Sequence, residues 1–129
     1  MTGNLLDTNV VLRALTQPSR LSARVRNAVV RGPNVISAVV FWEVVLKVMK
    51  GNLIVGEPRS WWFDALDMLA ATSLDLQPAH VAKVFSLPPI HSDPFDRILI
   101  AQAAVEHLTL ITTDQTIQRY AGRNLKVLA

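Results

Sequence analysis

The sequence contains no cysteine, which excludes disulfide bonds, thiolate nucleophiles and cysteine-ligated zinc, and fits a reducing compartment. Glycine is also scarce, at five of 129 residues. The patterns GxxxxGK(S/T), GxGxxG and GxSxG do not occur, so no phosphate-cradling loop or nucleophile elbow is expected. These absences remove thiol chemistry and the common nucleotide-binding loops from the candidate functions.

The sequence also lacks a hydrophobic run long enough to span a membrane. Its longest apolar stretch, Val35 to Met49, is shorter than the roughly 20 residues that a spanning helix needs. That stretch also contains Glu43 and Lys47. Asn4 and Asp7 interrupt the apolar residues near the amino terminus, so no signal peptide is expected. We therefore expect a cytoplasmic protein with no membrane partner.

Charged residues make up only 18% of the chain and apolar residues 50%, which argues against disorder. We expect one domain covering residues 1–129. The formal net charge is +3, which permits a polyanionic partner without requiring one. Five arginines lie in the first quarter of the chain, where Asp7 is the only acid: Arg13, Arg20, Arg24, Arg26 and Arg31. They form either a phosphate-contacting face or a solvated helix face.

Short apolar segments alternate with helical patterns along the whole chain. The expected strands cover residues 4–6, 34–36, 74–76, 108–112 and 125–128. The expected helices cover residues 8–17, 22–31, 38–50, 57–69, 80–87, 93–107 and 115–120. Because each strand is short and apolar on both faces, the pattern predicts an α/β domain. Its central parallel sheet has about five strands and is flanked by helices on both faces.

The expected helix that follows Asp93 begins with two acids on one face. Asp93 suits the N-cap position and Pro94 the first helical position, and Asp96 then lies in the first turn. One interpretation is that both acids stabilise the positive end of the helix dipole. The other is that Asp96 belongs to a site, which three further acids at similar junctions favour.

Those acids lie where strands end or where the next helix begins. Asp7 and Asp114 end the first and fourth expected strands, and Asp96 begins the helix that leads to the fourth. Glu43 lies about two turns into the helix after the second strand. Because sites in parallel sheets form at the carboxyl ends of the strands, we expect these four carboxylates to converge.

Glu43 is the most informative of the four acids. Its helix is apolar nearly all round, so we expect it to be largely buried, where an isolated carboxylate is costly. Either Lys47 pairs with Glu43 at i,i+4 on an exposed strip, or a bound cation compensates the charge. Carboxylate oxygens suit Mg²⁺ or Mn²⁺, which activate water and stabilise the leaving oxygen of a phosphodiester.

Four motifs follow one another along the chain: Asp7-Thr8-Asn9-Val10, Ile36-Ser37-Ala38-Val39 with Trp42-Glu43, Asp93-Pro94-Phe95-Asp96-Arg97 with Ile100-Ala101-Gln102-Ala103, and Thr112-Thr113-Asp114. In this order they resemble the motifs of the PIN-domain ribonucleases, and most closely those of the VapC-type toxins of bacterial toxin–antitoxin pairs. The resemblance extends over essentially the whole chain. The turn Lys50-Gly51-Asn52-Leu53 and the position of His91 before Asp93 also fit that family.

The resemblance implies an endoribonuclease toxin that needs Mg²⁺ or Mn²⁺, forms a homodimer and is inhibited by a VapB-like antitoxin. By position, Asp7, Glu43, Asp96 and Asp114 match the family's acidic quartet, which binds the metal and carries catalysis. Supporting polar positions are matched by Thr8, Asn9 and either Thr112 or Thr113. The RNA that is cut is not implied.

Several other residues have two interpretations each. Asp93 is either the N-cap or a contact behind the metal ligands, and Arg97 either binds the scissile phosphate or pairs with an acid. His91 is either a surface-loop histidine or an RNA contact. Trp61 and Trp62 either stack on bases or belong to the core or a dimer contact.

Two other functions compete with the nuclease. A non-catalytic PIN-like module that binds RNA or protein would be expected to lack one of the acids, and none is missing. A receiver-type phosphoacceptor domain needs an aspartate at the end of its third strand. Here Leu76 is followed by Gln77 and Pro78, which argues against it.

Overall fold

The structure is a computed structural model that describes residues 2–122 and 125–129. Within these residues, five short strands form one sheet: β1 (Asn4–Leu6), β2 (Asn34–Ser37), β3 (Ala71–Leu74), β4 (Thr109–Ile111) and β5 (Lys126–Leu128). Their order across the sheet is β3-β2-β1-β4-β5, and every neighbouring pair is parallel. The predicted α/β fold with a parallel sheet is confirmed.

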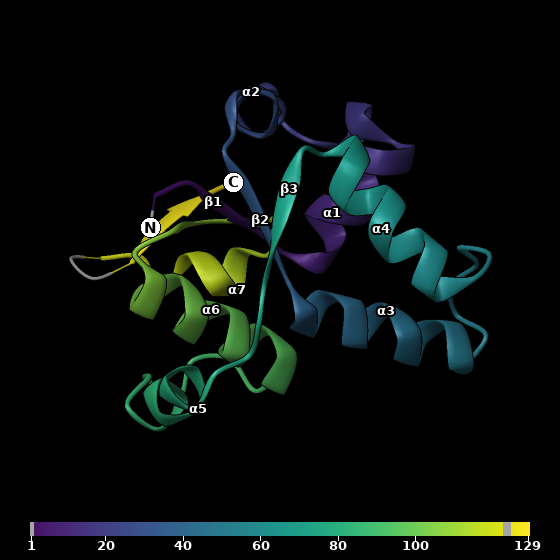
Figure 1. Ribbon diagram of the computed structural model, residues 1–129. Helices are drawn as coiled ribbons and strands as arrows, with labels where there is room; N and C mark the ends of the chain where they lie inside the picture. The colour runs from purple at the N-terminus through teal and green to yellow at the C-terminus, as the bar shows by residue number, and fades with distance from the viewer. Residues whose placement is uncertain (1, 123–124) are drawn as a thin grey trace.

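The helices cover both faces of this sheet (Figure 1). They are α1 (Thr8–Thr16), α2 (Ala23–Arg31), α3 (Ala38–Met49), α4 (Pro58–Met68), α5 (Pro78–Phe85), α6 (Pro94–Glu106) and α7 (Gln115–Gln118), with a short 3-10 helix η1 (Pro18–Arg20). The chain adds strands outward from β1 to β3 and then returns to β4, so right-handed crossovers put α1–α4 on one face and α5–α7 on the other. Among the described helices, none is both long and apolar enough to cross a membrane.

The three central strands β2, β1 and β4 supply the middle of the hydrophobic core. Their apolar side chains are almost fully buried: Leu5, Leu6, Val35, Ile36, Leu110 and Ile111. Burial on both faces of a strand requires helices on both faces of the sheet, which is why these strands read as unbroken apolar runs in the sequence.

The third strand begins earlier than the sequence indicates, at Ala71 instead of Leu74. Ala70 has a positive φ of 47° that ends the turn after α4, and pairing with β2 starts at the next residue. β3 is an edge strand in which only Leu74 is buried, so hydrophobic residues do not mark its start. The prediction of a strand at residues 74–76 is therefore wrong by about three residues.

Asp75 directly follows β3, so an aspartate does stand at the end of the third strand, as a receiver-type domain requires. In that fold the third strand lies next to the first, in the order 2-1-3-4-5. Here β3 is at the sheet edge, separated from β1 by β2, and Asp75 is exposed. The strand order excludes the receiver architecture, whereas Gln77 and Pro78 do not.

Helix α3 is buried on one face only, and the expectation that it is largely buried is wrong. Val39, Val40 and Val44 are its buried residues, whereas the side chains of Trp42 and Met49 are mainly exposed. A helix with valine and leucine on several faces is not necessarily buried on all of them, because folded proteins expose much apolar surface. Glu43 is partly buried, with 18% of its side chain exposed.

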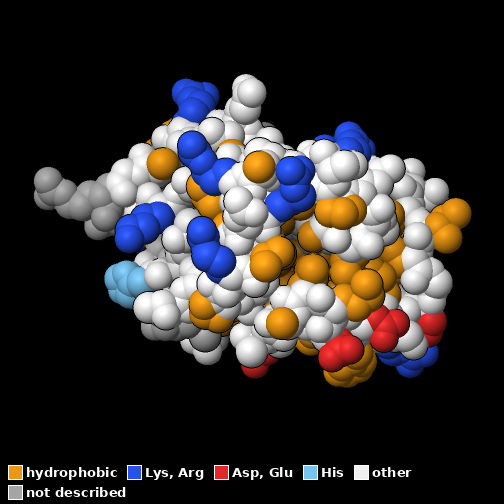
Figure 2. All heavy atoms as spheres, turned by 90° about the horizontal axis from the view of Figure 1, so that it is seen from above, with side chains coloured by type: hydrophobic (Ala, Val, Ile, Leu, Met, Phe, Trp, Pro, Cys, Tyr) orange, Lys and Arg blue, Asp and Glu red, His pale blue; other side chains and the backbone are white. Residues whose placement is uncertain are grey.

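The carboxyl ends of β1 and β4 lie side by side at the centre of the sheet, as the backbone N–H of Asp7 bonds to the carbonyl of Ile111 at 3.0 Å. The amino-terminal ends of α3 and α6 meet at this same edge, where Trp42 contacts Phe95 edge to face. The carboxyl end of α2, with Arg31, leads instead into the amino end of β2 at the opposite edge. Figure 2 views the molecule from the side on which α2 lies, and it shows Lys and Arg side chains spread over this surface with hydrophobic side chains beside them.

Candidate metal centre

Asp7 directly follows β1 and is 4% exposed. It caps α1, since one carboxylate oxygen accepts the N–H of Val10 at 2.8 Å. The other oxygen accepts the hydroxyl of Thr112. Burial raises the pKa of Asp7 to about 6, although the two hydrogen bonds act to lower it. The negative charges of Asp114 and Glu43 add to the rise.

Asp114 follows β4 and caps α7 by accepting the N–H of Thr116 at 2.7 Å. Thr112, which is fully buried, accepts the N–H of Asp114 at 2.9 Å while its own hydroxyl donates to Asp7. Partial burial acts to raise the pKa of Asp114, but hydrogen bonds from His91 and Thr116 outweigh it, and the pKa is lowered. Thr112 therefore ties the two strand-end acids together. Of the two candidate threonines, it is the one that contacts them.

Glu43 lies in α3 with its two oxygens in different contacts. Oε1 accepts the hydroxyl of Thr8 at 2.6 Å, and Oε2 lies 3.4 Å from Nζ of Lys47. The i,i+4 pair considered from the sequence is therefore present, yet Thr8 at the start of α1 also directs Glu43 toward Asp7. Asn9, the other polar residue beside Asp7, is exposed.

Asp96 lies in the first turn of α6, behind the N-cap Asp93. The carboxylate of Asp93 accepts the N–H groups of Phe95 and Asp96 at 2.8 and 3.2 Å, so the interpretation of Asp93 as the N-cap is confirmed. Burial raises the pKa of Asp96 to about 7, with a further rise from the charge of Asp93. The charges of Glu43 and Asp7 also act on Asp96, as expected for acids that share one pocket.

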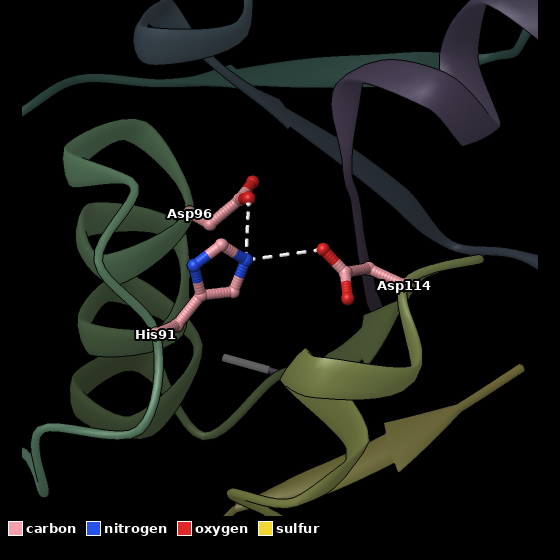
Figure 3. Close-up of side chains that lie close together, drawn as sticks. All are labelled: His91, Asp96 and Asp114. Atoms are coloured by element: carbon pink, nitrogen blue, oxygen red, sulfur yellow. Dashed lines mark hydrogen bonds and ion pairs between the residues drawn. The ribbon is translucent and has the colours of Figure 1, made fainter.

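His91, interpreted from the sequence as a surface-loop histidine or an RNA contact, lies between two of these acids (Figure 3). Its Nε2 is 3.0 Å from a carboxylate oxygen of Asp96 and 3.0 Å from one of Asp114. Its Nδ1 accepts the backbone N–H of Asp93 at 3.1 Å, so the ring proton is on Nε2. His91 is thus a hydrogen-bond donor to both carboxylates. The signal in the sequence was its position two residues before Asp93.

Arg97 makes contacts that neither interpretation drawn from the sequence included. Its guanidinium donates to the carbonyls of Val84, Pro88 and His91, at 3.1 to 3.2 Å. Through the several N–H donors of its planar guanidinium group, Arg97 holds the segment between α5 and α6 in place. Arg97 therefore stabilises the loop before α6 in this structure.

The remaining candidates lie apart from the acids. Trp62 is buried and stacks on Phe41 at a ring separation of 4.9 Å, which confirms a core role for it. Trp61 is partly buried against the same core. His80 is fully buried and contacts Glu106 at 3.0 Å, joining α5 to α6.

The donor set fits a hard divalent cation. One oxygen of Asp96 and one of Asp114 lie within 4.8 Å of each other, and Nε2–H of His91 donates to both. The charges of Asp7 and Glu43 act on the same pocket. Carboxylate oxygens are the ligands that Mg²⁺ and Mn²⁺ prefer. A cation would also compensate Asp7 and Asp96, whose negative charge burial disfavours.

The comparison with protein families matches the PIN domain over residues 5–123. The comparison with curated protein sequences gives no match. Among solved structures, the chain resembles VapBC2 from Rickettsia felis bound to a promoter DNA fragment, with a TM-score of 0.70 at 18% identity over 99% of this chain and 98% of that one.

Two further structures show the same fold. DNA-bound VapBC from Salmonella typhimurium has a TM-score of 0.67 at 15% identity, over 98% of each chain. A VapBC-5 complex from Mycobacterium tuberculosis, of the VapBC family of toxin–antitoxin systems, has a TM-score of 0.62 at 18% identity, over 98% of this chain and 97% of that one. At these identities the likeness supports the fold, and the acids must carry any statement about chemistry.

Proposed function

Because the chain belongs to the PIN-domain family, we propose that it is a metal-dependent endoribonuclease and the toxin of a toxin–antitoxin pair. Its substrate is RNA, its cofactor Mg²⁺ or Mn²⁺, and its reaction the hydrolysis of a phosphodiester bond. The observation that carries the proposal is that Asp7, Asp96, Asp114 and Glu43 come from four separate segments of the chain and act electrostatically on one pocket. Such a concentration of carboxylates destabilises the fold unless a cation compensates it.

Each acid has a defined part in this proposal. Asp7, Glu43, Asp96 and Asp114 hold the cation, and Thr112 and Thr8 orient Asp7 and Glu43 through their hydroxyls. When bound, the divalent cation supplies a water of lowered pKa and stabilises negative charge on the phosphodiester oxygens. The chain's contribution is to fix four carboxylates at the edge where β1 and β4 end.

The partner proposed for the protein is a VapB-like antitoxin, because its structural neighbours belong to VapBC complexes. We also expect a cytoplasmic homodimer. The exposed apolar side chains of Val81 and Phe85 on α5, the latter 96% exposed, would lose contact with water in such a dimer. Light scattering on Phe85→Asp, beside the parent protein, tests whether this helix takes part.

Cleavage of RNA tests the proposal. Purified protein is incubated with a mixed pool of transfer and ribosomal RNA in Mg²⁺, in Mn²⁺ or in EDTA. The proposal predicts cuts at discrete sites that need the metal and are lost in Asp7→Asn and Asp96→Asn. Folded, metal-binding protein that leaves every RNA intact would favour the non-catalytic binding module.

A further inference from the structure

His91 lies in the irregular segment between α5 and α6, so neither a helix nor a strand sets its position. Instead, both its backbone N–H and its backbone carbonyl form hydrogen bonds with side chains. The N–H of His91 donates to the hydroxyl of Tyr120 at 2.7 Å, and its carbonyl accepts Nη1 of Arg97 at 3.2 Å. With Nδ1 accepting from Asp93, only Nε2–H remains, and it points at Asp96 and Asp114.

Tyr120 is the centre of this arrangement. Its hydroxyl accepts the N–H groups of Ile90 and His91, at 3.1 and 2.7 Å, and donates to the carbonyl of Pro88 at 2.9 Å. A hydroxyl has one proton and two lone pairs, so these three contacts use its full capacity. The contact with Nη1 of Arg97, at 3.3 Å, is the longest of the four. One oxygen atom therefore organises the segment from Pro88 to His91.

We propose that Tyr120 is a positioning residue of the metal centre, whose hydroxyl holds His91 in place between Asp96 and Asp114. The inference rests on the proposed metal site, although the position of His91 can be measured in metal-free protein. Tyr120 lies just beyond α7, so it connects that end of the chain to the loop before α6. Of the contacts that its hydroxyl makes with the described residues, the one with His91 leads to Asp96 and Asp114.

The position of His91 matters because it joins two acids that repel each other. Nε2–H donates toward one oxygen of each carboxylate, which offsets part of their repulsion and fixes their orientation. Each carboxylate oxygen has two acceptor positions, so an oxygen bonded to His91 can still bind a cation. Groups that orient metal ligands in this way change metal affinity by about 10–100-fold when they are removed.

The first test observes His91 in metal-free protein by nitrogen-15 NMR of the histidine rings. In the parent protein we expect an unprotonated Nδ1 and a protonated Nε2. In Tyr120→Phe, which removes only the hydroxyl, we expect the signals to move toward a mixture of the two tautomers. Ser86→Ala removes a hydroxyl that bonds to Lys83 in the preceding turn, so it should leave His91 unchanged. Unchanged His91 signals in Tyr120→Phe would overturn the positioning role.

The second test measures Mn²⁺ affinity by calorimetry for Tyr120→Phe, His91→Ala and the double variant. We expect His91→Ala to weaken binding about tenfold and Tyr120→Phe by about threefold or more. Added to His91→Ala, the Tyr120 change should have no further effect, because it acts through the absent ring. Additive losses, or equal or tighter binding by His91→Ala, would overturn the inference. Failure of the parent protein to bind Mn²⁺ would instead contradict the proposed function, and the NMR result would still decide the role of Tyr120.

Discussion

The hydroxyl of Thr112 donates a hydrogen bond to the carboxylate of Asp7, a residue 105 positions earlier in the chain. The contact joins the ends of β1 and β4, the two adjacent strands at the middle of the sheet. Because both residues are buried, the bond satisfies a carboxylate oxygen that has little access to water. The fold and the candidate site thus depend on the same contact.

Replacing Thr112 with valine keeps the shape of the side chain and removes this bond. We expect Thr112→Val to lower the free energy of unfolding by about 1–3 kcal/mol, the usual cost of leaving a buried acceptor unpaired. Denaturation by urea measures the change. Thr113→Val is the matched control, since Thr113 is half-exposed, and equal losses in the two variants would contradict this account.

The stability of the metal-free protein should rise as the pH falls from about 7 to about 5. Burial raises the pKa of Asp7 to about 6 and that of Asp96 to about 7, whereas both ionise near 3.8 when unfolded. In this window the folded state binds more protons than the unfolded state, so acidification favours folding. Urea denaturation in EDTA at several pH values measures the trend. It should weaken in Asp7→Asn and Asp96→Asn, and stability that increases with pH would contradict the shifts.

The two interpretations of Asp93 differ in what asparagine does there. Asparagine is as good an N-cap as aspartate, so Asp93→Asn should keep the stability of the parent protein, whereas Asp93→Ala should lose about 1 kcal/mol. RNA cleavage by Asp93→Asn should persist. Complete loss of cleavage in a fully stable Asp93→Asn would show that its charge serves the site directly.

A substitution of Arg97 can also distinguish a structural role from a contact with RNA. Arg97→Lys keeps the positive charge but cannot reproduce the forked donation to the carbonyls of Val84, Pro88 and His91. We expect a loss of about 1–2 kcal/mol in the free energy of unfolding, seen in thermal or urea denaturation. A variant as stable as the parent protein but with weaker RNA binding would favour the phosphate contact instead.

The sequence predicted the parts of this protein that depend on local pattern. Capping residues such as Asp7, Ser37 and Asp93 and the apolar strands mark where elements begin, and all three residues do cap helices. The rule that parallel strands end at one edge then places Asp7 and Asp114 together. The β3 boundary was missed because an exposed edge strand has little hydrophobic signal.

The roles of His91 and Tyr120 could not be predicted from pattern. The hydrogen bonds from His91 join residues 23 and 29 positions apart, and they form in a segment without periodic structure. The contacts of Arg97 with backbone carbonyls could not be predicted for the same reason, because the path of an irregular loop has no sequence pattern. Contacts of this kind depend on the folded path of the chain.

Mn²⁺ binding, followed by electron paramagnetic resonance, shows whether the four carboxylates form one cation site. The proteins compared are the parent, Asp7→Asn, Glu43→Gln, Asp96→Asn, Asp114→Asn and the control Asp67→Asn, which changes an exposed acid of α4. We expect each of the first four variants to bind Mn²⁺ at least about tenfold more weakly than the parent and the control to bind like the parent. Parent-like binding by two or more of the four, with their folds intact, would contradict it.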